Sequence, residues 1–337
     1  MEELAVLTDF FCVAGSQGGA APAPVPAPAA KAANAPAAKN GNPKAAPAKA
    51  AKAPAAKAPA TKAPAAAAPA PAAFDAAGLP ATERVYLTYE GNFQLSCAAT
   101  VLACRAAPGA GGAPAVDLVF DVSVFHPQGG GQPSDVGVVR SAANGCEAAV
   151  ERVSFDFATG VVVHRAAVDV ADAFAVGDAV ELAVDAAARE AYSRCHTAGH
   201  MVDSAMVRAG YALPPTKGYH FLDAPYVEYK GDVPAAERDA LVARLKAEFA
   251  GLVDEDIATT IEMMEKARAE ARLNKVQQNF DFSVFKDPTV RVVGVAGFQC
   301  PCGGTHVKST GSLRDYTVVG IKVKKGVVRI KYDRAKK

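Results

Sequence analysis

The sequence predicts an α+β protein in which a small antiparallel β-barrel is followed by a second domain of mixed helices and strands. Residues 83–185 contain short β-branched runs separated by Gly, Pro and Asn, with no long helical pattern, as in a small barrel. In residues 186–337 the helical patterns form one group and the strand patterns another, which is typical of an α+β layer. Residues 16–82 are dominated by Ala, Pro and Lys and offer little to bury, so we expect a disordered N-terminal tail.

The composition limits the kind of protein that the chain can be. Half of the 337 residues are apolar, although the alanine-rich N-terminal tract inflates that fraction. The formal net charge of +1 excludes a polycation, so any contact with nucleic acid must come from local basic patches. Seven cysteines form no disulfide framework and follow no secretory signal, which favours reduced thiols and a cytoplasmic location. No uncharged apolar run reaches membrane-spanning length, so we expect a soluble protein without a membrane partner.

The first 82 residues divide into two segments with different predicted roles. A helix over residues 1–15 would gather its apolar side chains on one side, as a docking element for a partner protein does; a frayed terminus is the alternative. Acidic residues at its start argue against an organelle transit peptide. Residues 16–82 form the predicted linker, whose seven lysines would either attract RNA phosphates or keep a spacer soluble.

The barrel domain is predicted from seven strand-like runs and one glycine-rich loop. The expected strands cover residues 85–89, 93–97, 116–120, 137–139, 153–155, 161–164 and 179–184. The loop over residues 125–135 contains three consecutive glycines, so its backbone can approach a bulky ligand closely. It matches neither a P-loop nor the dinucleotide fingerprint, and an ordinary turn is the alternative to a binding site. Gln132 and Asp135 are the polar groups that such a loop would present to a ligand.

The second domain begins with a helix predicted over residues 186–209. Further helices are expected at 234–249 and 256–273, and strands at 218–223, 226–229, 290–295, 316–319, 321–323 and 327–332. The cysteine-containing loop at 300–306 would lie between strands and reach the first helix.

Two pairs of metal-ligating residue types occur about a hundred residues apart. His196 and His200 are four residues apart, which places both imidazoles on one face of a helix, and Cys302 and His306 repeat the spacing. Nitrogen and sulfur ligands of this kind favour a tetrahedral zinc site, whereas helix histidines with structural roles are the alternative. Thr197 stands where a zincin protease needs glutamate, which argues against peptide hydrolysis by that route.

Two further cysteines lie beside these motifs. Cys195 directly precedes His196, and Cys300 lies two residues before Cys302. Either thiol could substitute as a ligand, but we expect both to pack as small apolar side chains.

Three motifs occur in order along the chain: Gly129–Asp135, His196–His200 and Cys302–His306. Together they closely resemble the editing module of alanyl-tRNA synthetase and its free-standing relatives, the AlaX trans-editing proteins. The likeness covers roughly Glu83 to the C-terminus. It implies a zinc-dependent aminoacyl-tRNA hydrolase of translation quality control that acts on mischarged tRNA(Ala), mainly Ser-tRNA(Ala) and in some members Gly-tRNA(Ala). An alanine-activating pocket cannot strongly exclude serine, so a second, hydrolytic site is the remedy.

The resemblance also implies roles for individual residues. By position, His196, His200, Cys302 and His306 look like the Zn²⁺ ligands, and Gln132 falls where the family places a glutamine close to the bound amino acid. We count Gln132, Thr197 and Thr305 as candidate catalytic residues, because the two threonines could hydrogen-bond the serine hydroxyl; structural helix-turn threonines are the alternative. The candidate substrate-binding residues are Gly130, Gly131, Asp135, Thr216, Tyr219 and His220. Zinc could polarise the ester, orient the substrate or activate water.

The expected partners follow from the same resemblance. The length leaves no room for an ATP-binding aminoacylation domain, so editing would act in trans on mischarged tRNA(Ala). The N-terminal segment and its lysine-rich tail could contact other aminoacyl-tRNA synthetases. One rival function is serine editing of tRNA(Thr), against which the glycine–glutamine loop argues; another is a tRNA-binding or scaffold subunit of a synthetase assembly. Basic residues that could contact phosphates, or form a solvated surface, are Lys322, Lys324, Lys325, Arg329, Lys331, Arg334, Lys336 and Lys337.

Overall fold

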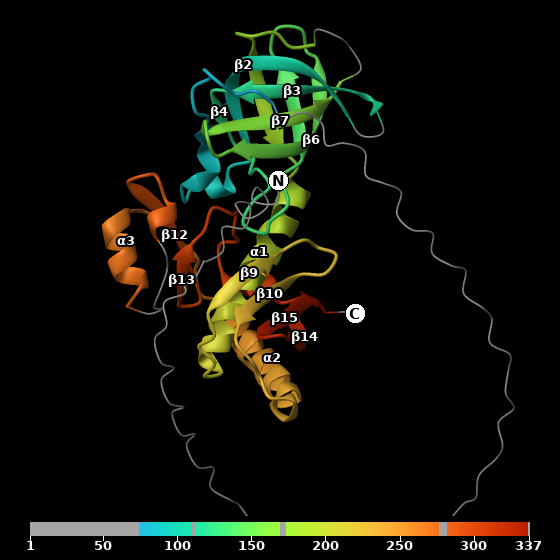
Figure 1. The fold of residues 1–337 in the computed structure, drawn as a ribbon. Coiled ribbons are helices and arrows are strands. Elements are labelled where there is room, and N and C mark those ends of the chain that lie inside the picture. The colour runs from blue at the N-terminus through green and yellow to red at the C-terminus, as the bar shows by residue number, and fades with distance from the viewer. Residues whose placement is uncertain (1–73, 110–111, 169–172, 276–281, 336–337) are drawn as a thin grey trace, which may run out of the picture. The chain divides into compact units, whose positions relative to one another are not determined.

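The structure, a computed structural model, describes residues 74–109, 112–168, 173–275 and 282–335 (Figure 1). The predicted docking element, nearly all of the predicted linker, and the last two basic residues lie outside this part of the chain. The end of the predicted linker, residues 74–82, was expected to be disordered, but the structure describes it as ordered. Ala76 and Thr82 are buried there, and the Thr82 hydroxyl donates a hydrogen bond to the Phe120 carbonyl oxygen. The described residues all belong to one compact unit, so the predicted domain boundary at residue 185 stays a prediction.

Six antiparallel strands form a closed barrel, which confirms the predicted small antiparallel β-barrel (Figure 1). They are β2 (Ser96–Pro108), β3 (Pro114–Phe120), β5 (Gly137–Ser141), β6 (Glu147–Asp156), β7 (Val161–Ala167) and β8 (Ala179–Val184). The order around the barrel is β2-β3-β7-β6-β5-β8. Buried side chains such as Val101, Leu118 and Leu182 fill the interior, because alternate residues of each strand point inward.

The chain that leads into the barrel differs from the prediction. Residues 85–89 were expected to be a strand but contain the 3₁₀ turn η1 (Val85–Leu87). The strand expected at 93–97 begins only at Ser96, as part of β2, because a second 3₁₀ turn, η2 (Gly91–Phe93), precedes it. The Thr88 hydroxyl accepts a hydrogen bond from the Gly91 N–H at 3.0 Å, which favours a turn over an extended chain. A two-residue strand β1 (Glu83–Arg84) pairs in parallel with β4 (Val122–Ser123).

After the barrel, helices and strands combine as a mixed α+β part, as predicted. The long helix α1 (Ala186–Arg208) begins at Asp185, whose side chain accepts a hydrogen bond from the Ala188 N–H. One sheet has the order β14-β15-β10-β9, from β14 (Tyr316–Lys324), β15 (Val327–Arg334), β10 (Tyr226–Lys230) and β9 (Pro215–Tyr219). A second sheet has the order β11-β12-β13, from β11 (Thr260–Glu265), β12 (Thr289–Val295) and β13 (Phe298–Pro301).

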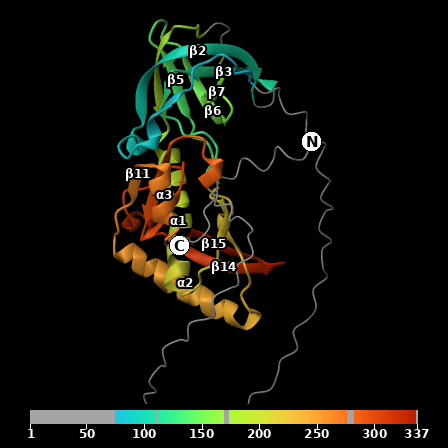
Figure 2. The same ribbon diagram turned by 60° about the vertical axis from the view of Figure 1, so that its left-hand side comes forward.

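The remaining helical elements complete this part. They are η4 (Ala235–Glu237), α2 (Arg238–Asp254), α3 (Lys266–Leu273), η5 (Phe282–Val284) and η6 (Thr310–Leu313). Helices α1 and α2 pack against each other, and α2 also packs on β14 (Figure 2). Met201 and Val202 of α1, Leu245 and Phe249 of α2, and Ile330 of β15 are buried together in the main apolar core. No helix among the described residues has the length and apolar character needed to cross a membrane.

Three predictions for this part were wrong in detail. The strand expected at 218–223 lies at Pro215–Tyr219, as β9. The helix expected over 256–273 is the strand β11 followed by the short helix α3, because Ile261 and Met264 pair with β12 instead of continuing a helix. The two strands expected at 316–319 and 321–323 form one strand, β14, with an irregularity between Val318 and Gly320.

Candidate metal centre

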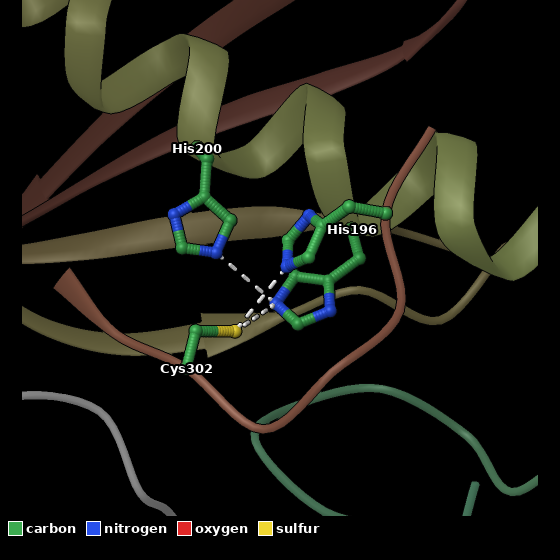
Figure 3. A group of neighbouring side chains, drawn as sticks. His196, His200 and Cys302 are labelled. Atoms are coloured by element: carbon green, nitrogen blue, oxygen red, sulfur yellow. Dashed lines mark hydrogen bonds between the residues drawn. The ribbon is translucent and has the colours of Figure 1, made fainter. Parts of the chain in front are cut away.

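Four predicted ligands come together in the structure, two from α1 and two from the loop that follows β13. His196 and His200 extend from successive turns of α1 toward Cys302 (Figure 3). The fourth residue, His306, lies in the same loop as Cys302, and one ligand atom of each residue falls within 4.8 Å of the other three. Such a group could hold a metal ion.

The distances between these ligand atoms can be compared with those of a tetrahedral zinc site. Zn–N bonds of about 2.0–2.1 Å and Zn–S bonds of about 2.3 Å place two nitrogens about 3.3 Å apart, and a nitrogen and a sulfur about 3.6 Å apart. The Nε2 atoms of His196 and His200 are 3.3 Å apart. The Cys302 Sγ lies 3.6 Å from His196 Nε2 and 3.4 Å from His306 Nε2. These three distances match those of a tetrahedral zinc site.

Gln132, from the glycine-rich loop of the barrel, fixes the ring of His196. Its side-chain oxygen lies 2.7 Å from His196 Nδ1 and accepts a hydrogen bond from the Thr305 backbone N–H at 3.0 Å. Because an amide oxygen can only accept, His196 Nδ1 must carry the proton. This leaves the Nε2 lone pair for a metal, the arrangement in which an outer partner orients a ligating histidine.

Thr197 fixes the ring of His306 in the same way. Its hydroxyl donates to the Ser193 carbonyl oxygen at 2.7 Å, so its oxygen can only accept from other groups. It lies 3.1 Å from His306 Nδ1 and 3.2 Å from the Val307 backbone nitrogen. His306 therefore also presents an unprotonated Nε2 toward the ligand group.

The two extra cysteines have different surroundings. Cys300 is buried, and its Sγ lies 3.5 Å from Nδ1 of His200, so it contacts the ring nitrogen that faces away from the ligand group. Cys195 is buried in the main apolar core, as expected of a packing residue.

The loop that carries Cys302 and His306 is held by long-range hydrogen bonds. Arg291 of β12 donates from Nη1 to the carbonyl oxygens of Cys302 and Gly304 at 2.6 and 2.8 Å. Asn92 of η2 donates to the His306 carbonyl oxygen at 2.8 Å and accepts from the His306 N–H at 3.0 Å. A Cβ at Gly304 would lie 2.1 Å from His196 Cε1, so only glycine allows the loop this close to α1.

Burial sets the protonation states of the ligand group. It lowers the pKa of all three imidazoles, that of His200 to about 4, so the rings are neutral near pH 7. Burial also raises the pKa of the Cys302 thiol, while the positive charge of Arg291 and the Gly304 N–H oppose this increase. Metal binding would therefore displace the thiol proton, and the imidazoles need lose none.

His220, predicted as a substrate-binding residue, lies beside the ligand group. Its ring stacks on that of His196 with 4.5 Å between centroids, and its backbone N–H donates to the Gly131 carbonyl oxygen at 2.8 Å. Its Nδ1 is hydrogen-bonded to the Tyr332 hydroxyl, which also donates to the Cys195 carbonyl oxygen. Burial is the largest cause that lowers the pKa of His220. Its contact with substrate stays a prediction.

The other predicted site residues fall into two groups. Gly131 contacts His220, and Thr305 contacts both Gln132 and Ser193, so both belong to the surroundings of the ligand group. The second group consists of Gly130, which adopts a positive φ of 57° in the glycine-rich loop, and of three residues whose hydrogen bonds are made elsewhere. Asp135 is buried in an ion pair with Arg189 of α1, Thr216 donates to the Glu228 carbonyl oxygen, and Tyr219 donates to Asp223. Their roles as substrate contacts remain predictions.

Sequence reasoning missed four residues that build the site. Asn92 and Arg291 hold the cysteine loop, Ser193 contacts Thr305 at 2.7 Å between hydroxyl oxygens, and Arg189 binds the glycine-rich loop through Asp135. Only Ser193 carried a signal, because it lies on the ligand face of the helix, three residues before His196.

Comparisons with known proteins agree with the three motifs. A family profile described as "Threonyl and Alanyl tRNA synthetase second additional domain" matches residues 290–331, which include Cys302 and His306. The alanine–tRNA ligase of Halobacterium salinarum is 27% identical over 271 residues, covering 76% of this chain and 26% of that protein. The alanine–tRNA ligase of Thermotoga petrophila is 33% identical over 228 residues, covering 64% of this chain and 24% of that protein.

A shorter relative is similar as well. The alanyl-tRNA editing protein AlaX-L of Pyrococcus horikoshii is 31% identical over 196 residues, covering 58% of this chain and 45% of that protein. The chain thus spans about a quarter of the two ligases and less than half of AlaX-L. These matches confirm the resemblance that the motifs indicated: the chain is similar to AlaX-type editing domains, at modest identity to its relatives.

Proposed function

We propose that this chain hydrolyses mischarged tRNA(Ala) in trans, with Ser-tRNA(Ala) as its main substrate and Gly-tRNA(Ala) as a second one. Water adds to the ester carbonyl carbon, the bond to the ribose oxygen breaks, and the amino acid and the tRNA hydroxyl are released. The observation that carries the proposal is the ligand group of His196, His200, Cys302 and His306, whose spacing suits zinc. The similarity of the chain to alanyl-tRNA editing proteins supports tRNA(Ala) as the RNA that bears the amino acid.

Zinc is the metal that the donor set favours, because two helix imidazoles, a third imidazole and a thiolate match its preferred nitrogen and sulfur ligands. Bound there, zinc would supply a positive charge that polarises the ester or orients the substrate's amino or hydroxyl group. Gln132 and Thr197, proposed from sequence as catalytic residues, are better assigned as positioning residues. Their acceptor atoms already hold His196 Nδ1 and His306 Nδ1.

Thr305 is the better candidate for recognising the serine hydroxyl. It forms a buried chain of hydroxyl and amide groups with Ser193 and Gln132, at 2.7 and 2.9 Å. A site built to hydrogen-bond a hydroxyl discriminates strongly against an analogue that lacks it, because its polar groups are then left unpaired. Correct alanyl-tRNA(Ala) would be spared for this reason, and Gly-tRNA(Ala), which also lacks the hydroxyl, would be hydrolysed more slowly than Ser-tRNA(Ala).

The remaining proposals concern tRNA. Exposed lysines of the β14–β15 hairpin, Lys322, Lys324 and Lys325, suit non-specific contact with phosphates. A tRNA-binding or scaffold role in a synthetase assembly is compatible with this hairpin and is the second candidate. Serine editing of tRNA(Thr) is a weaker candidate, because the curated relatives named above are alanyl proteins.

The test is metal analysis combined with deacylation assays on Ser-tRNA(Ala), Gly-tRNA(Ala) and Ser-tRNA(Thr). We expect stoichiometric zinc and release of serine from tRNA(Ala) by the wild type, and loss of both in Cys302→Ala. A matched control is Cys146→Ala, since Cys146 lies on the barrel outside the ligand group. Preferential release from Ser-tRNA(Thr) would favour the rival carrier, and zinc-independent deacylation would refute the metal proposal.

A further inference from the structure

A pocket of about 250 Å³ lies where η2, the first turns of α1 and the segment after His306 meet. Pockets for drug-sized ligands usually measure about 300–1,000 Å³, so this one suits a smaller group such as a single nucleoside. It holds none of the residues proposed from sequence as substrate contacts. The ligand of this pocket is therefore not assigned by those residues.

The floor of the pocket reaches the candidate metal centre. Ser193 and His306 both line it, and Ser193 contacts the Thr305 hydroxyl at 2.7 Å. His306 is one of the four metal-ligating residues. A group seated in this pocket would hold an attached ester next to the residues proposed to recognise serine.

The wall of the pocket combines an aromatic ring with a lysine. Phe93 is half-buried, and the Lys308 Nζ lies 5.4 Å from its ring centroid. Tyr89, which is exposed, meets the edge of Phe93 with 5.4 Å between centroids. Glu190 at the rim lies 3.9 Å from Arg194 Nε, which offsets the negative charge beside the opening.

Proteins that bind single-stranded nucleic acid commonly combine aromatic rings with positively charged side chains. Bases stack on the ring faces, and the cation binds the backbone phosphates. A cation over an exposed ring contributes only about a two- to fivefold gain in affinity. A stacked base contributes about 5- to 150-fold, so a base would displace Lys308 from Phe93 and free its ammonium group for a phosphate.

We propose that this pocket binds the single-stranded 3′ end of the RNA, with the terminal base on Phe93 and the phosphate before it on Lys308. The inference rests on the proposed function, because it gives the aminoacyl ester its route to the metal centre. The terminal ribose then lies between Phe93 and Ser193, with its ester directed at His306. A free amino acid ester without the RNA end would lack both contacts.

The test compares binding and hydrolysis in full-length variants. The probe is the 5′-phosphorylated RNA trinucleotide CCA, titrated by calorimetry at several salt concentrations. We expect Phe93→Ala to weaken binding by about 5- to 150-fold. Lys308→Ala should lower the slope of log affinity against log salt by about 0.7, the value for one single-strand phosphate contact. In deacylation of Ser-tRNA(Ala), both variants should raise KM and leave kcat and zinc content unchanged.

Matched controls keep the outcome interpretable. Phe157→Ala removes an exposed aromatic ring at the β6–β7 turn, and Lys246→Ala removes an exposed lysine of α2; neither should change trinucleotide binding. Phe93→Leu keeps apolar bulk without a stacking face, and it should behave like Phe93→Ala if stacking is the cause. Active protein whose trinucleotide binding and KM are unaffected by Phe93→Ala would overturn this inference alone. Protein that releases no serine would instead count against the proposed function.

Discussion

Gln132 is the residue whose loss tests most directly whether the barrel builds the metal centre. In Gln132→Ala, two buried N–H donors lose their acceptor, namely His196 Nδ1 and the Thr305 backbone nitrogen, and the Thr305 hydroxyl loses a donor. A buried donor without a partner costs about 1–3 kcal/mol, so folding stability should fall by about 2–6 kcal/mol.

In Gln132→Ala, the free energy of zinc binding should weaken by less than the free energy of unfolding. The orphaned Thr305 groups destabilise the metal-free and the metal-bound protein alike, so only the freed ring of His196 changes the binding equilibrium. Loss of such an outer partner weakens metal binding by about 10- to 100-fold, or about 1.4–2.7 kcal/mol. Gln132→Glu keeps an acceptor for both N–H groups, so its zinc affinity should fall by less than that of Gln132→Ala.

The assay is competition for zinc against a chelator of known affinity, with serine release from Ser-tRNA(Ala) measured on the same samples. Gln128→Ala is the matched control, because Gln128 is an exposed glutamine in the same glycine-rich loop. Wild-type zinc affinity in a folded Gln132→Ala variant would refute the proposed orientation of His196 by the barrel.

Three further predictions follow from the same surroundings. Asn92→Ala leaves both His306 backbone groups without their partner and should lower the free energy of unfolding by about 2–6 kcal/mol, measured by urea unfolding; an unchanged midpoint would show that the loop is held without Asn92. Zinc affinity should rise by up to tenfold per pH unit below the raised pKa of the Cys302 thiol, and chelator titrations that show no pH dependence would contradict thiolate ligation. Burial raises the pKa of Asp203 from 3.8 to about 7, so the folded state binds the proton more tightly and stability should fall as the pH rises from about 4 to 7. Asp203→Asn should abolish that part of the pH dependence in thermal unfolding, and an unaltered pH profile would exclude Asp203 as its source.

The parts of the fold that were predicted from sequence carry a strong local pattern. The strand at 179–184 and the helix from 186 were placed within a residue or so of their ends, because an alternation of apolar side chains marks the strand and Asp185 caps the helix. The prediction of a strand in the segment before the barrel was wrong. Val85 and Tyr86 favour a strand, but the Thr88–Gly91 turn determines the local structure.

Tertiary pairing explains the error at β11. Ile261 and Met264 are three residues apart, which is a helical spacing, but their backbone pairs with Val293 and Val290 of β12. Sequence alone could not reveal this competition, because the partner strand lies about thirty residues further on. Tertiary context overrides helix propensity in such segments.

The four candidate ligands could be picked out from the sequence because their spacing is local, whereas the residues that hold them could not. His196 and His200 lie on one helix face, and Cys302 and His306 share one loop. Asn92, by contrast, contacts His306 across 214 positions of the chain, and its neighbours resemble an ordinary turn. A single sequence contains no periodicity that could indicate a pairing at that distance.

These contacts give the barrel a role beyond folding. Gln132 from its glycine-rich loop orients His196, and Asn92 from its lead-in holds the backbone of His306, so one ligand from each pair depends on the barrel. The buried ion pair of Asp135 with Arg189 fixes the same loop to α1. Because an orphaned partner in such a network costs more than a lost surface contact, the second part without the barrel should bind zinc weakly. The barrel is therefore a component of the metal centre, and the site requires both parts of the chain.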